Sequence, residues 1–248
     1  MATRTAETSP HIEVPLIVTR AKVVGFLFLL PIPLWLFGSS YVPSRLVVPG
    51  DAAAAARNIM AAETLFRLGI VSVLLIMVAD IAMVLLLYQL LKPVNKNLAV
   101  LMVILNLLAV PIAMLNELNQ FAVLFLVHGN DSLKTFTPDQ WHILMSLFMN
   151  LHDIGTTIGG IFWGLWLVPY GLLVFKSGFF PRVMGALLII ECFGFLIQSF
   201  VGFLVPGLQA NLTLLPAITG WAELFVPLWL LIRGVNVEQW KKLALASV

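Results

Sequence analysis

Charged residues are scarce in this sequence. Only 10% of its 248 residues are Asp, Glu, Lys or Arg, and 60% are hydrophobic. Soluble domains carry about 25% charged residues, so the composition excludes a water-soluble domain. The formal net charge of +2 is too small, and the basic residues too dispersed, to indicate nucleic acid as a partner. We therefore expect the lipid bilayer to surround most of the chain.

Motifs for known chemistry are also missing. The single cysteine, Cys192, lies in an apolar segment and cannot form an intramolecular disulfide. There is no H-E-x-x-H zinc pattern, no glycine-rich phosphate loop and no G-x-S-x-G elbow. None of the four histidines is placed to ligate a haem within the membrane. The sequence predicts no catalytic residue, no cofactor-binding site and no metal site.

What the sequence has in abundance is long apolar runs, and about 20 residues suffice to cross the hydrocarbon. Residues 1–20 are polar and are expected to form a disordered tail without a cleavable signal. Residues 21–234 are predicted to be an all-α transmembrane domain, and residues 235–248 a short basic tail. The six predicted spans are 23–38, 65–91, 98–127, 154–175, 183–204 and 215–232.

The stretch 162–190 is predicted to form a hairpin of two apolar helices joined by a basic turn that contains Lys176 and Arg182. Lysine and arginine concentrate in cytosolic loops. If the N-terminus lies inside, ten of these residues fall on the cytosolic side and four outside. The bias places both termini in the cytosol, and this turn with them.

Three runs together resemble a known family: PGDAAAAARNIMAAETLFRLGI, LLYQLLKPVNKNLAVL and GLWLVPYGLLVFKSGFFPRVMGALLI. The family consists of bacterial multi-pass membrane proteins and is known only as a domain of unknown function. The resemblance extends over roughly residues 20–233. It implies a six-helix protein of the inner (plasma) membrane, and it carries no reaction, cofactor or catalytic residue.

Three acidic residues lie at one depth in three different spans. Asp80 is 12 residues from Lys92, Glu191 is 9 from Arg182 and Glu223 is 10 from Arg233. At about 1.5 Å per residue these spacings place the carboxyl groups roughly 13–18 Å above the cytosolic charges, near the membrane midplane. Gln198 shares a helical face with Glu191, and Thr219 shares one with Glu223.

Ionisable residues within spans are costly and mark ion or proton pathways. The three acids could carry protons or bind a cation. Alternatively, each acid is protonated and only joins neighbouring helices by a hydrogen bond. Both interpretations predict an inward-facing polar site.

A second polar set is predicted near the outer interface, roughly 31–38 Å up from the cytosolic charges. Its members could line a vestibule, although polar residues are also ordinary at an interface. They are Arg67, Asn106, Glu117, Gln120, His152 and Asp153.

The fourth span carries small residues at helix-packing spacing, namely Gly155, Gly159, Gly160 and Gly164. Such residues let helices approach closely, either within one bundle or between copies in a homo-oligomer. Three functions remain open. They are a small transporter-like bundle that uses the midplane carboxylates, a non-catalytic structural or regulatory subunit, and an intramembrane enzyme that acts on lipid with His152, Asp153 and Glu117.

Overall fold

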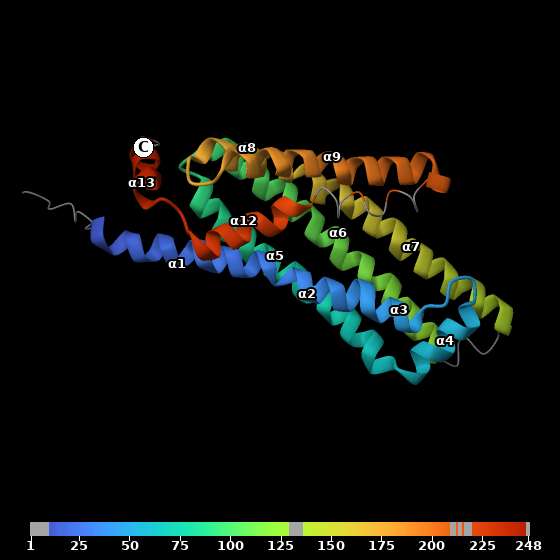
Figure 1. Ribbon diagram of the computed structural model, residues 1–248. Helices are drawn as coiled ribbons and strands as arrows, with labels where there is room; N and C mark the ends of the chain where they lie inside the picture. The colour runs from blue at the N-terminus through green and yellow to red at the C-terminus, as the bar shows by residue number, and fades with distance from the viewer. Residues whose placement is uncertain (1–9, 129–135, 209–211, 213–214, 216–219, 247–248) are drawn as a thin grey trace, which may run out of the picture.

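The computed structural model describes residues 10–128, 136–208, 212, 215 and 220–246, and every regular element within these ranges is a helix. The helices form an elongated bundle (Figure 1). The predicted all-α membrane bundle is confirmed, with five helical stretches long and apolar enough to cross a bilayer among the described residues. They are Pro15–Leu46, Glu63–Leu91, Lys96–His128, Asp139–Ser177 and Arg182–Leu204.

The first stretch is longer than the sequence predicts. It starts at Pro10, within the predicted tail, and continues beyond Gly38, where a loop was expected. Pro31, Pro33 and Pro43 lie in the first turns of new helical segments, where a missing N–H costs nothing, whereas Pro15 lies inside α1. A π-helical turn carries the helix across the junction. The elements are α1 (Pro10–Leu29), α2 (Pro31–Trp35), η1 (Leu36–Tyr41) and α3 (Val42–Leu46).

Asp51 caps the short helix that follows. Its Oδ1 accepts a hydrogen bond of 2.8 Å from the Ala54 N–H. Two long helices then form an antiparallel pair with a tight turn at Lys92–Asn95, and a kinked pair follows them. These elements are α4 (Ala52–Ala61), α5 (Glu63–Leu91), α6 (Lys96–His128), α7 (Pro138–Leu165) and α8 (Leu167–Ser177).

Helices α8 and α9 (Arg182–Leu204) form the predicted hairpin. Gly178, at φ 72°, ends α8 in the left-handed conformation that glycine adopts most easily. The two helices touch through their backbones, because a Cβ on Gly171 would lie 2.6 Å from the Gly185 carbonyl oxygen. Neither glycine can be replaced without separating the helices.

The sixth apolar helix is short. Within α12 (Trp221–Ile232), only Glu223–Ile232 is an apolar helix by length and composition. Most of the chain that leads into it, including Thr219, lies outside the described residues. A short 3₁₀ turn, η3 (Pro206–Leu208), follows α9, and α13 (Val237–Ala246) ends the described chain.

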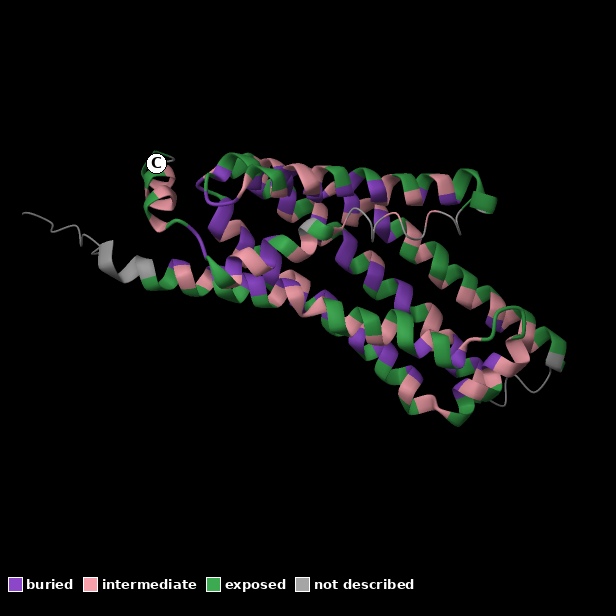
Figure 2. Ribbon diagram, viewed as in Figure 1, coloured by how far each residue is buried: buried purple, intermediate pink, exposed green. Residues whose placement is uncertain are grey.

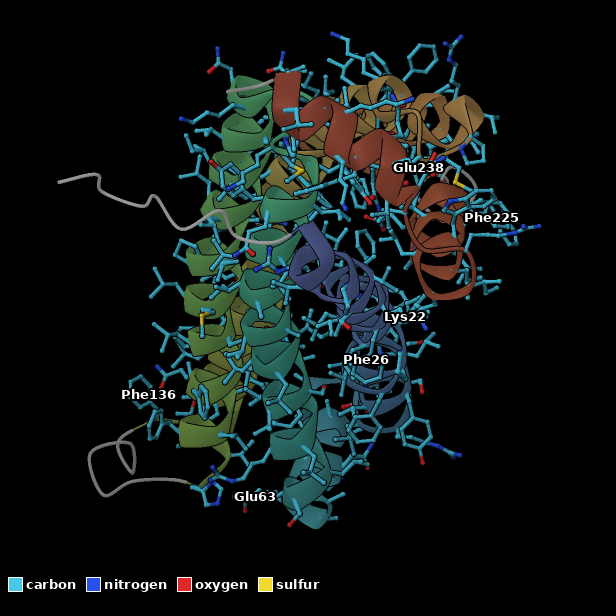
Figure 3. All side chains as sticks on the ribbon, turned by 90° about the vertical axis from the view of Figure 1, so that its left-hand side faces the viewer. Lys22, Phe26, Glu63, Phe136, Phe225 and Glu238 are labelled. Atoms are coloured by element: carbon cyan, nitrogen blue, oxygen red, sulfur yellow. The ribbon has the colours of Figure 1, made fainter. Side chains whose placement is uncertain are left out.

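The basic turns gather at one end of the bundle. The Trp229 indole N–H donates to the Phe179 carbonyl in the hairpin turn (3.1 Å), and the Trp240 indole N–H donates to the Leu90 carbonyl before the α5–α6 turn (2.9 Å). Figure 3 shows Glu238 at this end, with Glu63 and Phe136 at the opposite end. The predicted cytosolic turns therefore share one face.

Large apolar side chains cover the outside of the long helices. Leu115 is 65% exposed, Phe125 64% and Phe193 57%. Buried residues face the interior, where α1, α5, α6, α8 and α12 meet (Figure 2). This inside-out distribution suits a bilayer rather than water as the solvent.

Candidate functional site

The three midplane acids come together from three helices. The carboxyl groups of Glu191 on α9 and Glu223 on α12 are close neighbours. Asp80 on α5 lies within electrostatic range of Glu223. Neighbouring carboxylates repel each other when both are ionised, so this arrangement favours a proton on one of the pair. We call Asp80, Glu191 and Glu223 the carboxylate cluster.

A fourth side chain joins this cluster from α6. Asp80 has Asn106 as a close neighbour, and Asn106 is 1% exposed. The sequence analysis assigns Asn106 to the outer set, but the structure places it beside Asp80. Its spacing contained the right signal, because 10 residues from Lys96 correspond to about 15 Å, the depth of the carboxylates.

Tyr170 on α8 is a residue that the sequence analysis missed. It is 0% exposed and lies within electrostatic range of Glu223. Its ring stacks on Trp166, with centroids 5.1 Å apart, and lies 6.1 Å from the ring of Phe28. It is only six residues from Lys176, but side chains on a helix tilt towards the N-terminus, which raises this hydroxyl towards the cluster.

Helix α12 is held in place by a glycine on α1. A Cβ on Gly25 would lie 2.8 Å from the Pro227 carbonyl oxygen and 2.9 Å from Leu231. This close approach fixes the level of Glu223. Pro227 has no N–H, so the Glu223 carbonyl loses its helical hydrogen-bond donor and adds an acceptor near the cluster.

Of the two other predicted members of the central site, the structure describes only Gln198, which lies apart from the carboxylate cluster. Gln198 is half-buried on α9, two helical turns from Glu191. Thr219 lies outside the described residues.

The outer set divides into separate contacts. The His152 Nε2 on α7 lies 3.2 Å from a Glu117 oxygen on α6, and its Nδ1 lies 3.8 Å from Asp153. Glu117 is buried at 4% exposed. Asn116 strengthens the same interface by donating to the His152 carbonyl (2.8 Å). This group binds α6 to α7.

Arg67 belongs to another cluster, at the far end of α5. Both Arg67 and His128 contact the carboxylate of Glu63, and the His128 Nε2 lies 2.8 Å from it. A cavity of about 250 Å³ lies beside Arg67 and His128. Gln120 is half-buried on α6, nearly one turn beyond Glu117. The predicted vestibule residues therefore do not line one space.

The glycine face of α7 is occupied by helices of the same chain. A Cβ on Gly155 would lie 1.9 Å from the Asn116 Oδ1, and one on Gly164 would lie 2.9 Å from Phe195 on α9. Gly160 faces Ser199, whose hydroxyl donates to the Thr157 carbonyl (3.0 Å). Gly159 is buried against Trp163 of its own helix.

The comparisons with known proteins agree with the fold and assign no activity. The model of the family described as "Domain of unknown function (DUF4386)" matches residues 23–234. An uncharacterised protein of Archaeoglobus fulgidus is 27% identical over 170 residues, which cover 68% of this chain and 86% of that protein. No solved structure matches.

Proposed function

The chain belongs to this family of unknown function, and we propose from its own geometry that it is a transporter-like membrane protein whose carboxylate cluster carries protons. The proximity of the Glu191 and Glu223 carboxyl groups carries the proposal, because two adjacent acids without a counter-charge favour a shared proton. Asp80 is a third acceptor within electrostatic range of Glu223. In a related form of this function, a cationic solute binds to the same carboxylates and displaces the proton.

The position of the cluster supports a role beyond packing. Glu191 is 1% exposed, while Asp80 and Glu223 are only partly buried. The acids come from α5, α9 and α12, and no lysine, arginine or histidine hydrogen-bonds to them among the described residues. Ionisable groups that face a bundle interior without a counter-charge are typical of proton relays.

Reconstitution tests the proposal. Purified protein in liposomes with an imposed pH gradient is expected to show proton flux or pH-linked solute uptake. Glu191→Gln and Glu223→Gln keep the side-chain shape and remove the exchangeable proton, so each should abolish the flux. Glu238→Gln, on the exposed face of α13, is the matched control. Unchanged flux in both cluster variants would refute the proposal.

The proposal includes a topology of six spans with both termini in the cytosol of a bacterial inner membrane. Segregation of the basic turns at one end of the bundle supports it. In a Cys192→Ala background, single cysteines at Ser44 and Ser247 should react with a membrane-impermeant reagent from opposite sides of the membrane. Labelling of both from one side would overturn this topology.

A second candidate function is an enzyme that acts on lipid, because His152, Glu117 and Asp153 do converge. His152 would act as general acid or base at the outer leaflet. Lipid extracts from cells with the wild-type protein and His152→Ala should then differ. The third candidate, a structural subunit, draws no support from the glycine face, which α6 and α9 of the same chain occupy.

A further inference from the structure

Three buried polar atoms around the carboxylate cluster have no hydrogen-bond partner. They are the Asn106 Oδ1, the Tyr170 hydroxyl and the Glu191 Oε2, on α6, α8 and α9. Their residues are 1%, 0% and 1% exposed. An unsatisfied buried polar atom costs about 1–3 kcal/mol, and native proteins rarely leave one without a reason. Within the described residues, these three are the buried side-chain nitrogen or oxygen atoms that lack a hydrogen-bond partner.

The three atoms belong to one neighbourhood. Asn106 is a neighbour of Asp80, and Glu191 of Glu223. Glu223 in turn lies within electrostatic range of both Asp80 and Tyr170. The unpartnered atoms therefore belong to residues that surround the carboxylate cluster, and the residues that flank them pack in one hydrophobic core.

Their chemistry suits water. The Asn106 Oδ1 and an ionised Glu191 oxygen only accept hydrogen bonds, whereas a tyrosine hydroxyl donates one and accepts others. A water molecule donates two hydrogen bonds and accepts two, and a buried one usually has two to four polar partners. Water can donate a hydrogen bond to the Asn106 Oδ1 or to the Glu191 Oε2, and it can accept one from the Tyr170 hydroxyl. The site needs no added charge to be satisfied.

We propose that Asn106, Tyr170 and Glu191 bind internal water that connects the Glu191–Glu223 pair to Asp80 and forms the path of the transferred proton. This inference rests on the proposed function and assigns the neutral residues Asn106 and Tyr170 to the same site. It also gives a partner to the buried hydroxyl of Tyr170, whose ring stacks with Phe28 and Trp166.

The transfer balances. The O–H bond of the protonated glutamate breaks, and its proton passes to the water oxygen. The water releases one of its own protons to the Asp80 carboxylate, so the water is regenerated. The glutamate pair gains one negative charge and Asp80 loses one. Asn106 and Tyr170 orient the water and are positioning residues, since neither changes its own charge.

Among the described residues of the surrounding helices, no positively charged side chain adjoins the path of this proton. Helices α5, α6, α8, α9 and α12 present Asp80, Asn106, Tyr170, Glu191 with its neighbour Cys192, and Glu223. On α1, which packs against α12, the nearest charged residue is Lys22, and it is exposed. The route therefore contains acids and neutral polar groups.

Infrared difference spectroscopy tests the inference on the full-length protein in lipid nanodiscs during an acid titration, in H₂O and in D₂O. Glu191→Gln and Glu223→Gln identify the carboxyl C=O band of the pair. Tyr170→Phe removes one oxygen and keeps the aromatic stack, while Asn106→Leu removes the amide at similar volume. Tyr41→Phe, on the exposed face of η1, is the matched control.

If water joins the site, Tyr170→Phe and Asn106→Leu shift the C=O band and slow proton flux in liposomes by about tenfold, as expected for one lost hydrogen bond in the path. Tyr41→Phe changes neither. Thermal unfolding of each variant shows that it is folded. A tyrosine that only packs would alter unfolding without moving the band.

Two other results are informative in different ways. If the glutamine variants remove the band but Tyr170→Phe and Asn106→Leu leave band and flux unchanged, the water path is wrong and the proposed function stands. If the glutamine variants remove no band, the pair holds no exchangeable proton, and both proposals fall together.

Discussion

The carboxyl groups of Glu191 and Glu223 are close neighbours although the two residues are 32 positions apart in the chain and the turn at η3 lies between them. The pair joins α9 to α12, so it is a tertiary contact as well as a proton site. Burial of two acids carries a large desolvation cost, which a proton shared between them only partly offsets.

We therefore predict that the double variant Glu191→Leu/Glu223→Leu stays folded. Replacing both partners of a buried polar pair with apolar residues is often neutral, or stabilising by about 1–4 kcal/mol. Its unfolding temperature in detergent should equal or exceed that of the wild type, and its proton flux should be absent. A large loss of stability would show that the pair is chiefly structural.

Gly155→Ala should separate α6 from α7. The new methyl group would meet the Asn116 Oδ1 at 1.9 Å, and Asn116 would have to abandon its bond to the His152 carbonyl. Overpacking of this kind costs about 1–3 kcal/mol.

Gly159→Ala is the matched control for that change. A methyl group there meets only Trp163 of its own helix, at 3.5 Å. Thermal unfolding of the two variants in the same detergent is the measurement. Equal behaviour would mean that Asn116 adapts without loss.

Glu117→Leu is expected to destabilise the same interface, because it leaves the buried side of His152 without an acceptor at Nε2. A lost partner of this kind costs about 1–3 kcal/mol. Glu117→Gln keeps an oxygen at that place and should cost less. Asp153→Asn changes an 81% exposed side chain and should alter stability by less than about 0.5 kcal/mol. Chemical or thermal unfolding ranks the three variants.

Trp240→Phe should release α13 from the bundle. The indole N–H is the donor to the Leu90 carbonyl, and phenylalanine offers none. Hydrogen exchange in Val237–Ala246 should accelerate, while α5 keeps its protection. Trp221→Phe, at a 55% exposed position, is the control and should leave α13 unchanged. Slow exchange of α13 in Trp240→Phe would assign its docking to other contacts.

Much of the fold is accessible from composition, because a bilayer demands long apolar helices. The hairpin around Gly178 and the cap at Asp51 follow from local rules for turns and caps. The extent of the first helical stretch does not follow from these rules, because Pro31 and Pro33 normally signal the end of a helix. Only the structure reveals that both prolines lie in the first turn of α2, a new segment of the same helical stretch.

The candidate site shows where counting along a helix stops being informative. Residue spacing gives depth, and it identified the level of Asp80, Glu191 and Glu223. It does not tell which helices are neighbours, so the position of Asn106 beside Asp80 was missed. Tyr170 was missed because residue counting gives the depth of its Cα, which lies closer to the cytosolic end than its hydroxyl does.

The glycine contacts divide the helices around the cluster into two rigid pairs. Gly25 joins α1 to α12 backbone against backbone, and Gly171 with Gly185 joins α8 to α9 in the same way. The contact between Glu191 and Glu223 joins one pair to the other. Two negative charges at this contact would repel each other, so loss of the proton would weaken the packing of α9 against α12.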